Sequence, residues 1–198
     1  MNIAILTFEG FNELDSFIAL GILNRMKSQG FNVRITCPSP EVTSMNGLTI
    51  KAQEQLEFAN SADVVLFGSG MLTRDIVKDE KIMSRLNFDA TKQLLAGQCS
   101  GTLIMAKLGL LNKIPACTDL TTTPWVKEAG IEVLNQPLYA NGNIATAGGC
   151  MASQYLAAWI ITKVRGEEDS KNAIHYVAPV GEKEQSVEHV WSILKPYV

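Results

Sequence analysis

Histidine and net charge are scarce in this sequence, and long apolar runs are absent. The 198 residues include two histidines, and 17 Lys and Arg stand against 20 Asp and Glu, a formal charge of −3. Without a basic surplus, the chain lacks what binding to nucleic-acid phosphates requires, so we expect no nucleic-acid partner. No apolar run approaches the ~20 residues of a membrane span, and residues 1–6 show neither the basic start nor the cleavage site of a signal peptide. We therefore expect a cytoplasmic protein without a membrane partner.

The four cysteines, Cys37, Cys99, Cys117 and Cys150, form no C-x-x-C pair. With so few histidines, this spacing argues against a structural zinc site and a thioredoxin-type motif, and we expect neither a metal nor a cofactor. Because a cytosolic chain keeps its thiols reduced, we expect no disulfides. Cys117 and Cys150 stand in apolar stretches and are interpreted as core thiols, whereas the role of Cys37 stays open.

Short apolar segments alternate with helical patterns along the chain, with no linker or internal repeat. Strands are expected at 2–7, 31–36, 62–67, 93–97, 131–133, 137–140 and 144–146, with a hairpin formed by 42–43 and 48–51. Helices are expected from residue 12 to before residue 30, and at about 81–86, 90–92, 101–111, 125–130, 152–165 and 184–194. This order predicts one α/β domain over residues 1–198 with a mostly parallel central sheet. Ligands of such sheets bind beyond the carboxyl ends of the strands.

The segment Gly97-Gln98-Cys99-Ser100-Gly101 has the form of a nucleophile elbow with cysteine as the nucleophile. It lies between an expected strand and an expected helix. Such a turn strains the nucleophile's backbone, and the glycines two positions before and after it avoid clashes. The helix that begins at Ser100 directs its N–H groups at the sulfur, which predicts a lowered thiol pKa. A buried structural cysteine between chance glycines is the alternative, but the strand–helix junction favours a functional one.

Two further segments are expected at the same edge of the sheet. The loop Gly68-Ser69-Gly70 follows a strand, and a backbone N–H there can face a developing oxyanion together with the N–H of Ser100. Glu13 and Asp15 lie in the first turn of the first helix, where an acid commonly serves as a cap. The geometry of an open sheet also brings this turn toward Cys99. A protonated carboxyl in that place can donate a hydrogen bond to a thiolate and act as a general acid.

The order of these elements resembles the ThiJ/PfpI superfamily, over essentially the whole chain. That superfamily is related to the class I glutamine amidotransferases, and the resemblance implies a flavodoxin-like three-layer α/β/α sandwich. Residues 10–15, 109–111 and 175–179 resemble its isonitrile hydratase branch. By this resemblance Cys99 is the nucleophile and Asp15 is the acid that contacts it.

The resemblance further assigns the N–H donors to Gly70 and Ser100. Many members carry a histidine after the elbow helix, where this chain has Asp119 beside Thr118. A Cys–His peptidase or amidase needs a base that takes the thiol proton and returns it to the leaving group, which Asp119 does poorly at its ordinary pKa. Asp119 and Thr118 are therefore interpreted as possible pocket residues.

The two histidines are unpromising replacements for that base. His189 is expected on the surface of the last helix, and His175 reaches the site only if its segment folds back. The resulting hypothesis is a small-molecule enzyme that uses Cys99 and Asp15, most like an isonitrile hydratase. A non-catalytic thiol redox sensor or stress protein stays open as an alternative, as do a glyoxalase or deglycase and an amidase or peptidase. We also expect a homodimer, because the superfamily usually dimerises and the apolar helix 152–164 exceeds what a surface helix needs.

Overall fold

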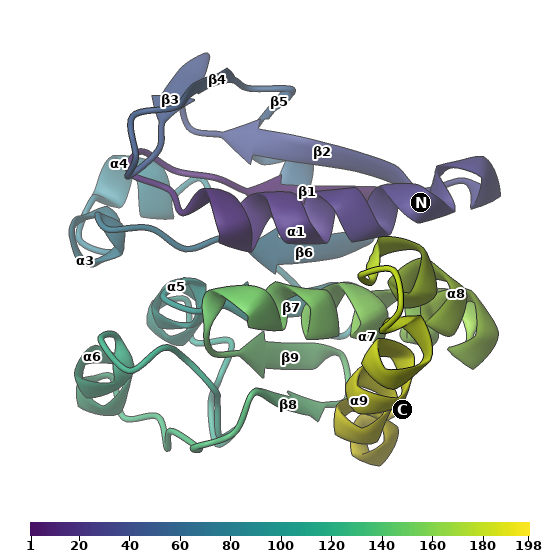
Figure 1. Ribbon diagram of the computed structural model, residues 1–198. Coiled ribbons are helices and arrows are strands. Elements are labelled where there is room, and N and C mark those ends of the chain that lie inside the picture. The colour runs from purple at the N-terminus through teal and green to yellow at the C-terminus, as the bar shows by residue number, and fades with distance from the viewer.

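A seven-stranded sheet with helices on both faces forms the centre of the molecule in the computed structural model, which describes residues 1–198 (Figure 1). The strand order is β5-β2-β1-β6-β7-β9-β8, and every neighbouring pair is parallel except β8 with β9. The strands are β1 (Asn2–Leu6), β2 (Asn32–Cys37), β5 (Glu54–Gln55), β6 (Val64–Phe67), β7 (Leu94–Gln98), β8 (Leu138–Asn141) and β9 (Ile144–Ala147). The mostly parallel sheet that the alternation of elements predicts is confirmed.

Strand β1 illustrates why such strands are apolar almost throughout. Its side chains alternate between the two faces of the sheet, so Ile3 and Ile5 pack into one core and Ala4 and Leu6 into the other. All four are fully buried. A strand with helices on both faces therefore shows an unbroken apolar run rather than an alternation.

The helices form two layers. One core packs α1 (Glu13–Leu23), α7 (Ser153–Arg165), α8 (Glu167–Val177) and α9 (Lys183–Leu194), and the other packs α2 (Glu57–Asn60) and α5 (Gly101–Lys107). The remaining short helices are α3 (Thr73–Ile76), α4 (Glu80–Met83) and α6 (Thr123–Glu128), and β3 (Glu41–Thr43) pairs with β4 (Thr49–Lys51) in the expected hairpin. The three-layer α/β/α sandwich is therefore confirmed.

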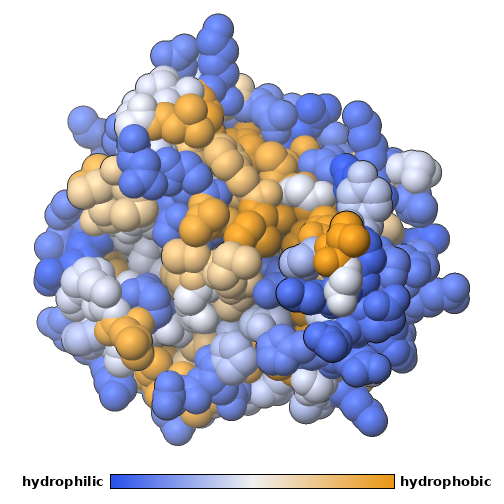
Figure 2. Space-filling model, viewed as in Figure 1, coloured by the Kyte–Doolittle hydropathy of each residue, from blue (hydrophilic) through white to orange (hydrophobic).

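Burial inside one chain accounts for the apolar residues of helix α7, which the sequence alone linked to a dimer. It lies between the sheet, α1, α8 and α9, and its Trp159 is fully buried (Figure 1). The apolar residues of 152–164 therefore fill the core of one chain and do not indicate a dimer. Apolar side chains do gather on the face over α1 (Figure 2), where Phe17, Ile18 and Val177 line a cavity of about 380 Å³. The homodimer stays a prediction.

Two expected elements are absent, and four observed ones are not expected from the sequence. Residues 90–92 form a single turn, not a helix, because the Leu94 N–H already donates to the carbonyl of Asp63 at 3.0 Å, where β7 begins. Residues 131–133 form no strand, since only Val133 makes a bridge, with Ala116. The four unexpected elements are the helices α8, α2 and α3 and the short strand β5. None of the helices combines the length and apolar character that crossing a bilayer requires.

Gly101 sits where the first turn of α5 touches the end of β6. A Cβ atom added at Gly101 would lie 2.1 Å from the carbonyl oxygen of Phe67, which is backbone and has little room to move. We expect Gly101→Ala to lower the free energy of unfolding by about 1–3 kcal/mol, measured by urea denaturation.

The matched control for this substitution is Gly21→Ala. Gly21 lies in α1, and a Cβ added there meets nothing within 4 Å. The control should be neutral or gain up to about 1 kcal/mol from helix propensity. Equal stability of the two variants would contradict the close packing at the elbow.

Candidate active site

A cavity of about 410 Å³ lies at the carboxyl edge of the sheet, where ligand sites of parallel sheets occur. Each of four neighbouring strands is followed by a residue that lines it. Asp15 follows β1, Ser69 follows β6, Cys99 follows β7 and Cys150 follows β9. Asp119, on the loop before α6, lines the same cavity. The structure thus places Asp15, Cys99 and Asp119 along one cavity, and their roles in it stay predictions.

Cys99 occupies the turn between β7 and α5 in a strained backbone conformation. Its φ is 46°, in the left-handed region that side chains other than glycine rarely adopt. Two hydrogen bonds hold the turn: the Cys99 N–H donates to the carbonyl of Ala147 at 2.8 Å, and the Thr118 hydroxyl donates to the Cys99 carbonyl at 2.7 Å. The strain expected of an elbow is therefore present, and Thr118 helps to maintain it.

The flanking glycines permit this turn for the reason that the sequence indicates. A Cβ at Gly97 would lie 2.6 Å from the Met105 sulfur, and one at Gly101 would overlap the end of β6. Only residues without a side chain allow the strand and the helix to meet this closely.

Asp15 turns its carboxylate into the site and does not cap its own helix. The cap of α1 is Asn12, whose side chain accepts from the Leu14 N–H at 3.1 Å. The Asp15 side chain is fully buried and accepts a hydrogen bond from the Ser69 hydroxyl, while the Asn12 N–H donates to the Ser69 carbonyl at 2.9 Å. The other acid of this turn, Glu13, points away and binds Ser44 of the hairpin. Asp15 is thus the acid that faces the cysteine.

The loop Gly68-Ser69-Gly70 approaches the first helix because glycine leaves room. A Cβ at Gly70 would lie 2.5 Å from the carbonyl oxygen of Gly10. The Gly70 N–H donates to the Ser100 hydroxyl at 3.1 Å, and that hydroxyl also pairs with the Thr73 hydroxyl at 2.7 Å. Gly70 and Ser100 are therefore neighbours in the site, and their role as oxyanion donors stays a prediction.

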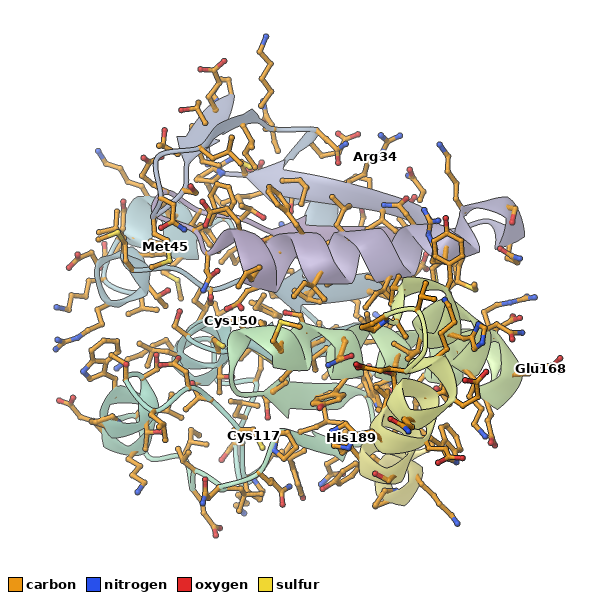
Figure 3. The ribbon with its side chains drawn as sticks, viewed as in Figure 1. Arg34, Met45, Cys117, Cys150, Glu168 and His189 are labelled. Atoms are coloured by element: carbon orange, nitrogen blue, oxygen red, sulfur yellow. The ribbon has the colours of Figure 1, made fainter.

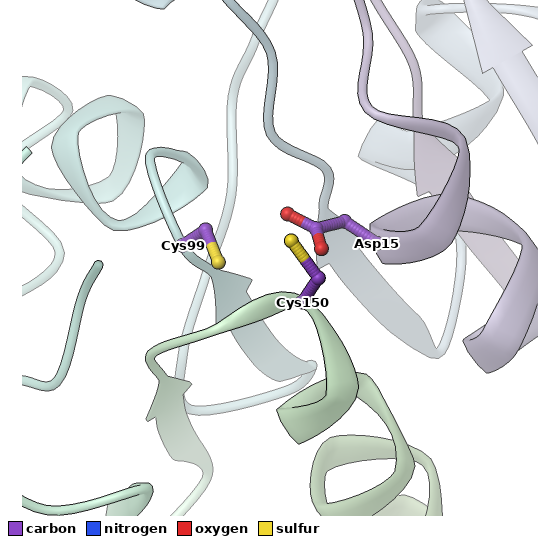
Figure 4. A group of neighbouring side chains, drawn as sticks. All are labelled: Asp15, Cys99 and Cys150. Carbon is purple, nitrogen blue, oxygen red and sulfur yellow. The ribbon is translucent and has the colours of Figure 1, made fainter. Parts of the chain in front are cut away.

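Cys150 is a site residue, not the core thiol that its apolar neighbours in the sequence suggested. A carboxylate oxygen of Asp15 and the sulfur atoms of Cys99 and Cys150 lie within 4.8 Å of one another (Figure 4). The Asn12 side-chain amide donates to the Cys150 sulfur at 3.2 Å. A signal for this position exists in the sequence, because Cys150 directly follows Gly148-Gly149 after a strand that ends at this edge. Cys37 and Cys117 are buried elsewhere, and burial raises the pKa of each to about 12.

Burial dominates the protonation of Asp15 and Cys99. It raises the pKa of the Asp15 carboxyl, against the hydrogen bond from the Ser69 hydroxyl that lowers it. Burial, followed by the negative charge of Asp15, raises the pKa of the Cys99 thiol. The lowered thiol pKa expected from the helix dipole is therefore wrong, because the seven-residue α5 does not offset desolvation and a neighbouring carboxylate. Burial thus favours the protonated form of each group.

Asp119 and the histidines take up different positions relative to the cavity. The Asp119 carboxylate accepts from the backbone N–H groups of Thr121 and Thr122 at 2.9 and 3.0 Å, so it caps the turn that leads into α6. His175, on α8, is exposed and lies 3.5 Å from Glu184. His189, on α9, pairs with the hydroxyl of Tyr155 on α7 at 3.1 Å (Figure 3). Neither histidine lines the cavity.

A parallel α/β sandwich with a cysteine on a strained strand-to-helix turn, facing an acid from the first helix, defines the class of this protein. The sequence profile of the DJ-1/PfpI family matches residues 1–163, and the chain belongs to that family. This is the ThiJ/PfpI relationship that the motifs predict. A search of curated protein sequences gives no match.

Solved structures share the fold at low sequence identity. DJ-1 from Schizosaccharomyces pombe matches with a TM-score of 0.78 and 16% identity, over 90% of this chain and 100% of that one. A ThiJ/PfpI family protein from Pseudomonas syringae gives a TM-score of 0.76 and 19% identity, over 98% of this chain and 87% of that one. A cysteine-to-alanine mutant of a DJ-1 superfamily protein from Salmonella typhimurium gives 0.72 and 18%, over 96% and 97%.

Proposed function

We propose that this protein is a cysteine-dependent hydratase that converts isonitriles, R–N≡C, into N-substituted formamides. The observation that carries the proposal is the buried Asp15 carboxyl close to the buried Cys99 thiol, two groups whose pKa values burial raises. The resemblance of residues 10–15 to the isonitrile hydratase branch supports the same substrate class. A cavity of about 410 Å³ suits a small molecule.

The first step adds the Cys99 thiol to the terminal carbon of the isonitrile. Asp15 takes the thiol proton as the sulfur forms its bond to carbon, and then delivers that proton to the same carbon. The product is the thioimidate R–N=CH–S–Cys99, which contains every atom of thiol and isonitrile. A base of higher pKa is not needed, because the proton returns to the substrate in the same step.

The second step releases the product with water. A water molecule loses a proton to the Asp15 carboxylate and attacks the thioimidate carbon, and Asp15 passes that proton to the nitrogen. The resulting adduct, R–NH–CH(OH)–S–Cys99, expels the sulfur as Asp15 takes the hydroxyl proton and hands it to the sulfur, which leaves R–NH–CHO. The net reaction is R–N≡C plus water to the formamide, with Asp15 and Cys99 returned to their starting protonation.

The redox sensor is less well supported by the same site. Peroxides react with thiolates, and a sensor cysteine therefore has a low pKa and good exposure. Cys99 is 4% exposed, and burial raises its pKa. A hydratase avoids this difficulty because Asp15 removes the thiol proton only as the substrate reacts.

The proposal is tested by supplying the purified protein with alkyl and aryl isonitriles, and separately with glyoxals and peptide amides. Nuclear magnetic resonance should detect N-substituted formamide from an isonitrile, at a rate proportional to protein concentration. The Cys37→Ala variant serves as the control, because it removes a buried thiol outside the cavity. Turnover of glyoxals or amides without any formamide would replace this proposal with another activity of the site.

A further inference from the structure

Three atoms of types that commonly ligate metals lie close together in the site, and no local sequence motif predicts this cluster. A carboxylate oxygen of Asp15 and the sulfur atoms of Cys99 and Cys150 lie within 4.8 Å of one another and come from three different elements (Figure 4). Sequence spacing argued against zinc because it can detect only ligands that are close in the chain. The fold supplies the set from distant segments.

We propose that Asp15, Cys99 and Cys150 bind one thiophilic divalent cation, for which Zn²⁺ is the reference. Two cysteine sulfurs and one carboxylate oxygen are ligands that zinc uses, and three protein ligands leave a fourth position for water. Zn–S bonds of about 2.3 Å place two ligating sulfurs about 3.8 Å apart in a tetrahedron. Ligand atoms now within 4.8 Å therefore need to approach by only about 1 Å, which side-chain rotation achieves.

The Asp15 carboxylate supplies an independent indication of a missing partner. Asp15 is fully buried, and its Oδ1 atom has no hydrogen-bond partner, whereas Oδ2 accepts from Ser69. A buried acceptor without a partner is costly, and such atoms in native proteins call for an explanation. A cation bound by Oδ1 provides it, while the Ser69 hydroxyl fixes the orientation of the carboxylate as outer-shell groups do in metal sites.

Both sulfur atoms also have an outer shell. The Asn12 side-chain amide donates to the Cys150 sulfur at 3.2 Å, and the Gln98 side-chain amide donates to the Cys99 sulfur at 3.4 Å. Gln98 is itself held by a hydrogen bond to the carbonyl of Gly149 at 2.9 Å. Hydrogen bonds of this kind orient ligands and stabilise the thiolate form. Each ligating thiol releases its proton to solvent when the cation binds.

Occupancy by the cation blocks the thiol. The cation takes the Cys99 sulfur and the Asp15 oxygen, so the site cannot hold zinc and add Cys99 to a substrate at the same time. Binding of the cation requires only the three ligand atoms and does not depend on the proposed hydratase activity.

The test is a zinc titration of the purified full chain in competition with a chromogenic chelator. The wild-type protein should take up one Zn²⁺ per chain. Loss of an outer-shell partner typically weakens metal affinity ~10–100-fold, so removal of a ligand in Cys150→Ala should weaken it at least ~100-fold, and Asn12→Ala by ~10-fold. The Cys37→Ala variant also lacks one thiol, but outside the cluster, and should bind zinc as the wild type does.

Cobalt provides a second readout. Co²⁺ in the wild-type protein should give the ultraviolet charge-transfer absorption of a thiolate-bound ion, reduced in Cys150→Ala and unchanged in Cys37→Ala. Circular dichroism of each variant establishes that it is folded. The proposal is overturned if the wild type binds no zinc at micromolar concentration, or if Cys150→Ala binds as tightly as Cys37→Ala. Because no substrate is present, failure of the isonitrile assay leaves this result unaffected.

Discussion

Cys99→Ala should lose at least ~10³-fold in the rate of formamide production from an isonitrile, because no other group can form the thioimidate. The other cavity thiol, Cys150, lacks the strained left-handed backbone that holds Cys99 in its turn. Cys99→Ser should be nearly as inactive, since Asp15 is too weak a base to activate a serine hydroxyl. The measurement is initial rate by nuclear magnetic resonance, with Cys37→Ala as the control.

Covalent chemistry gives this prediction an additional readout. Rapid acid quenching of the wild-type reaction should reveal a protein whose mass is increased by that of one isonitrile, mapped to the peptide that contains Cys99. The adduct should be absent from Cys99→Ala. The midpoint of thermal unfolding of this variant should equal that of the wild type, as a control for its fold. Formamide production by Cys99→Ala at the wild-type rate would exclude Cys99 as the nucleophile.

Asp15→Asn should reduce turnover by ~10²–10⁴-fold, the usual contribution of a positioned general acid–base. An amide keeps the size of the side chain and can still accept from the Ser69 hydroxyl, so the fold should persist. It cannot take the thiol proton. Removal of the negative charge should also lower the pKa of Cys99, which can be followed by the ultraviolet absorbance of the thiolate. A merely structural role for Asp15 would not move that pKa.

The same substitution should make the protein more stable at neutral pH. Burial raises the pKa of Asp15 in the folded chain above its unfolded value. A raised carboxyl pKa stabilises the fold below the unfolded pKa, and this contribution is lost as the pH rises through the folded pKa. At pH 7 the charged carboxylate is therefore a cost that Asn removes. Asp15→Asn should unfold at a higher temperature than the wild type at pH 7, and the difference should shrink in acid; the opposite sign at pH 7 would contradict the burial argument.

Much of the fold could be predicted from the sequence because its buried strands are continuous apolar segments. The segments at 2–7 and 62–67 were recognised as strands since both of their faces are buried, and the cap at Asn12 marked the start of α1. The helix expected at 90–92 does not form because pairing in the sheet competes with it: the Leu94 N–H donates to the Asp63 carbonyl and begins β7 after one turn. Such competition is decided by geometry that residue patterns do not express.

The sequence likewise predicts two residues of the candidate site, Cys99 and Asp15, but not the third, Cys150. Cys99 can be identified from the sequence because an elbow requires glycines at fixed spacing. Asp15 can be identified because it follows the first strand. Cys150 was missed, since the β9 register that brings it to Asp15 depends on the assembled sheet. The pKa of Cys99 was mispredicted for a related reason: a helix dipole can be inferred from order along the chain, but desolvation depends on what covers the thiol in three dimensions.

The distribution of the three converging side chains has a consequence for how the protein matures. Asp15 comes from the first helix, Cys99 from the middle of the chain and Cys150 from the segment after β9, so the cluster exists only after β1, β7 and β9 have docked in one sheet. A nascent or partly unfolded chain has the thiols but not the arrangement. A ligand that requires all three groups binds the native state more tightly than the unfolded chain and shifts the folding equilibrium toward the native state by mass action.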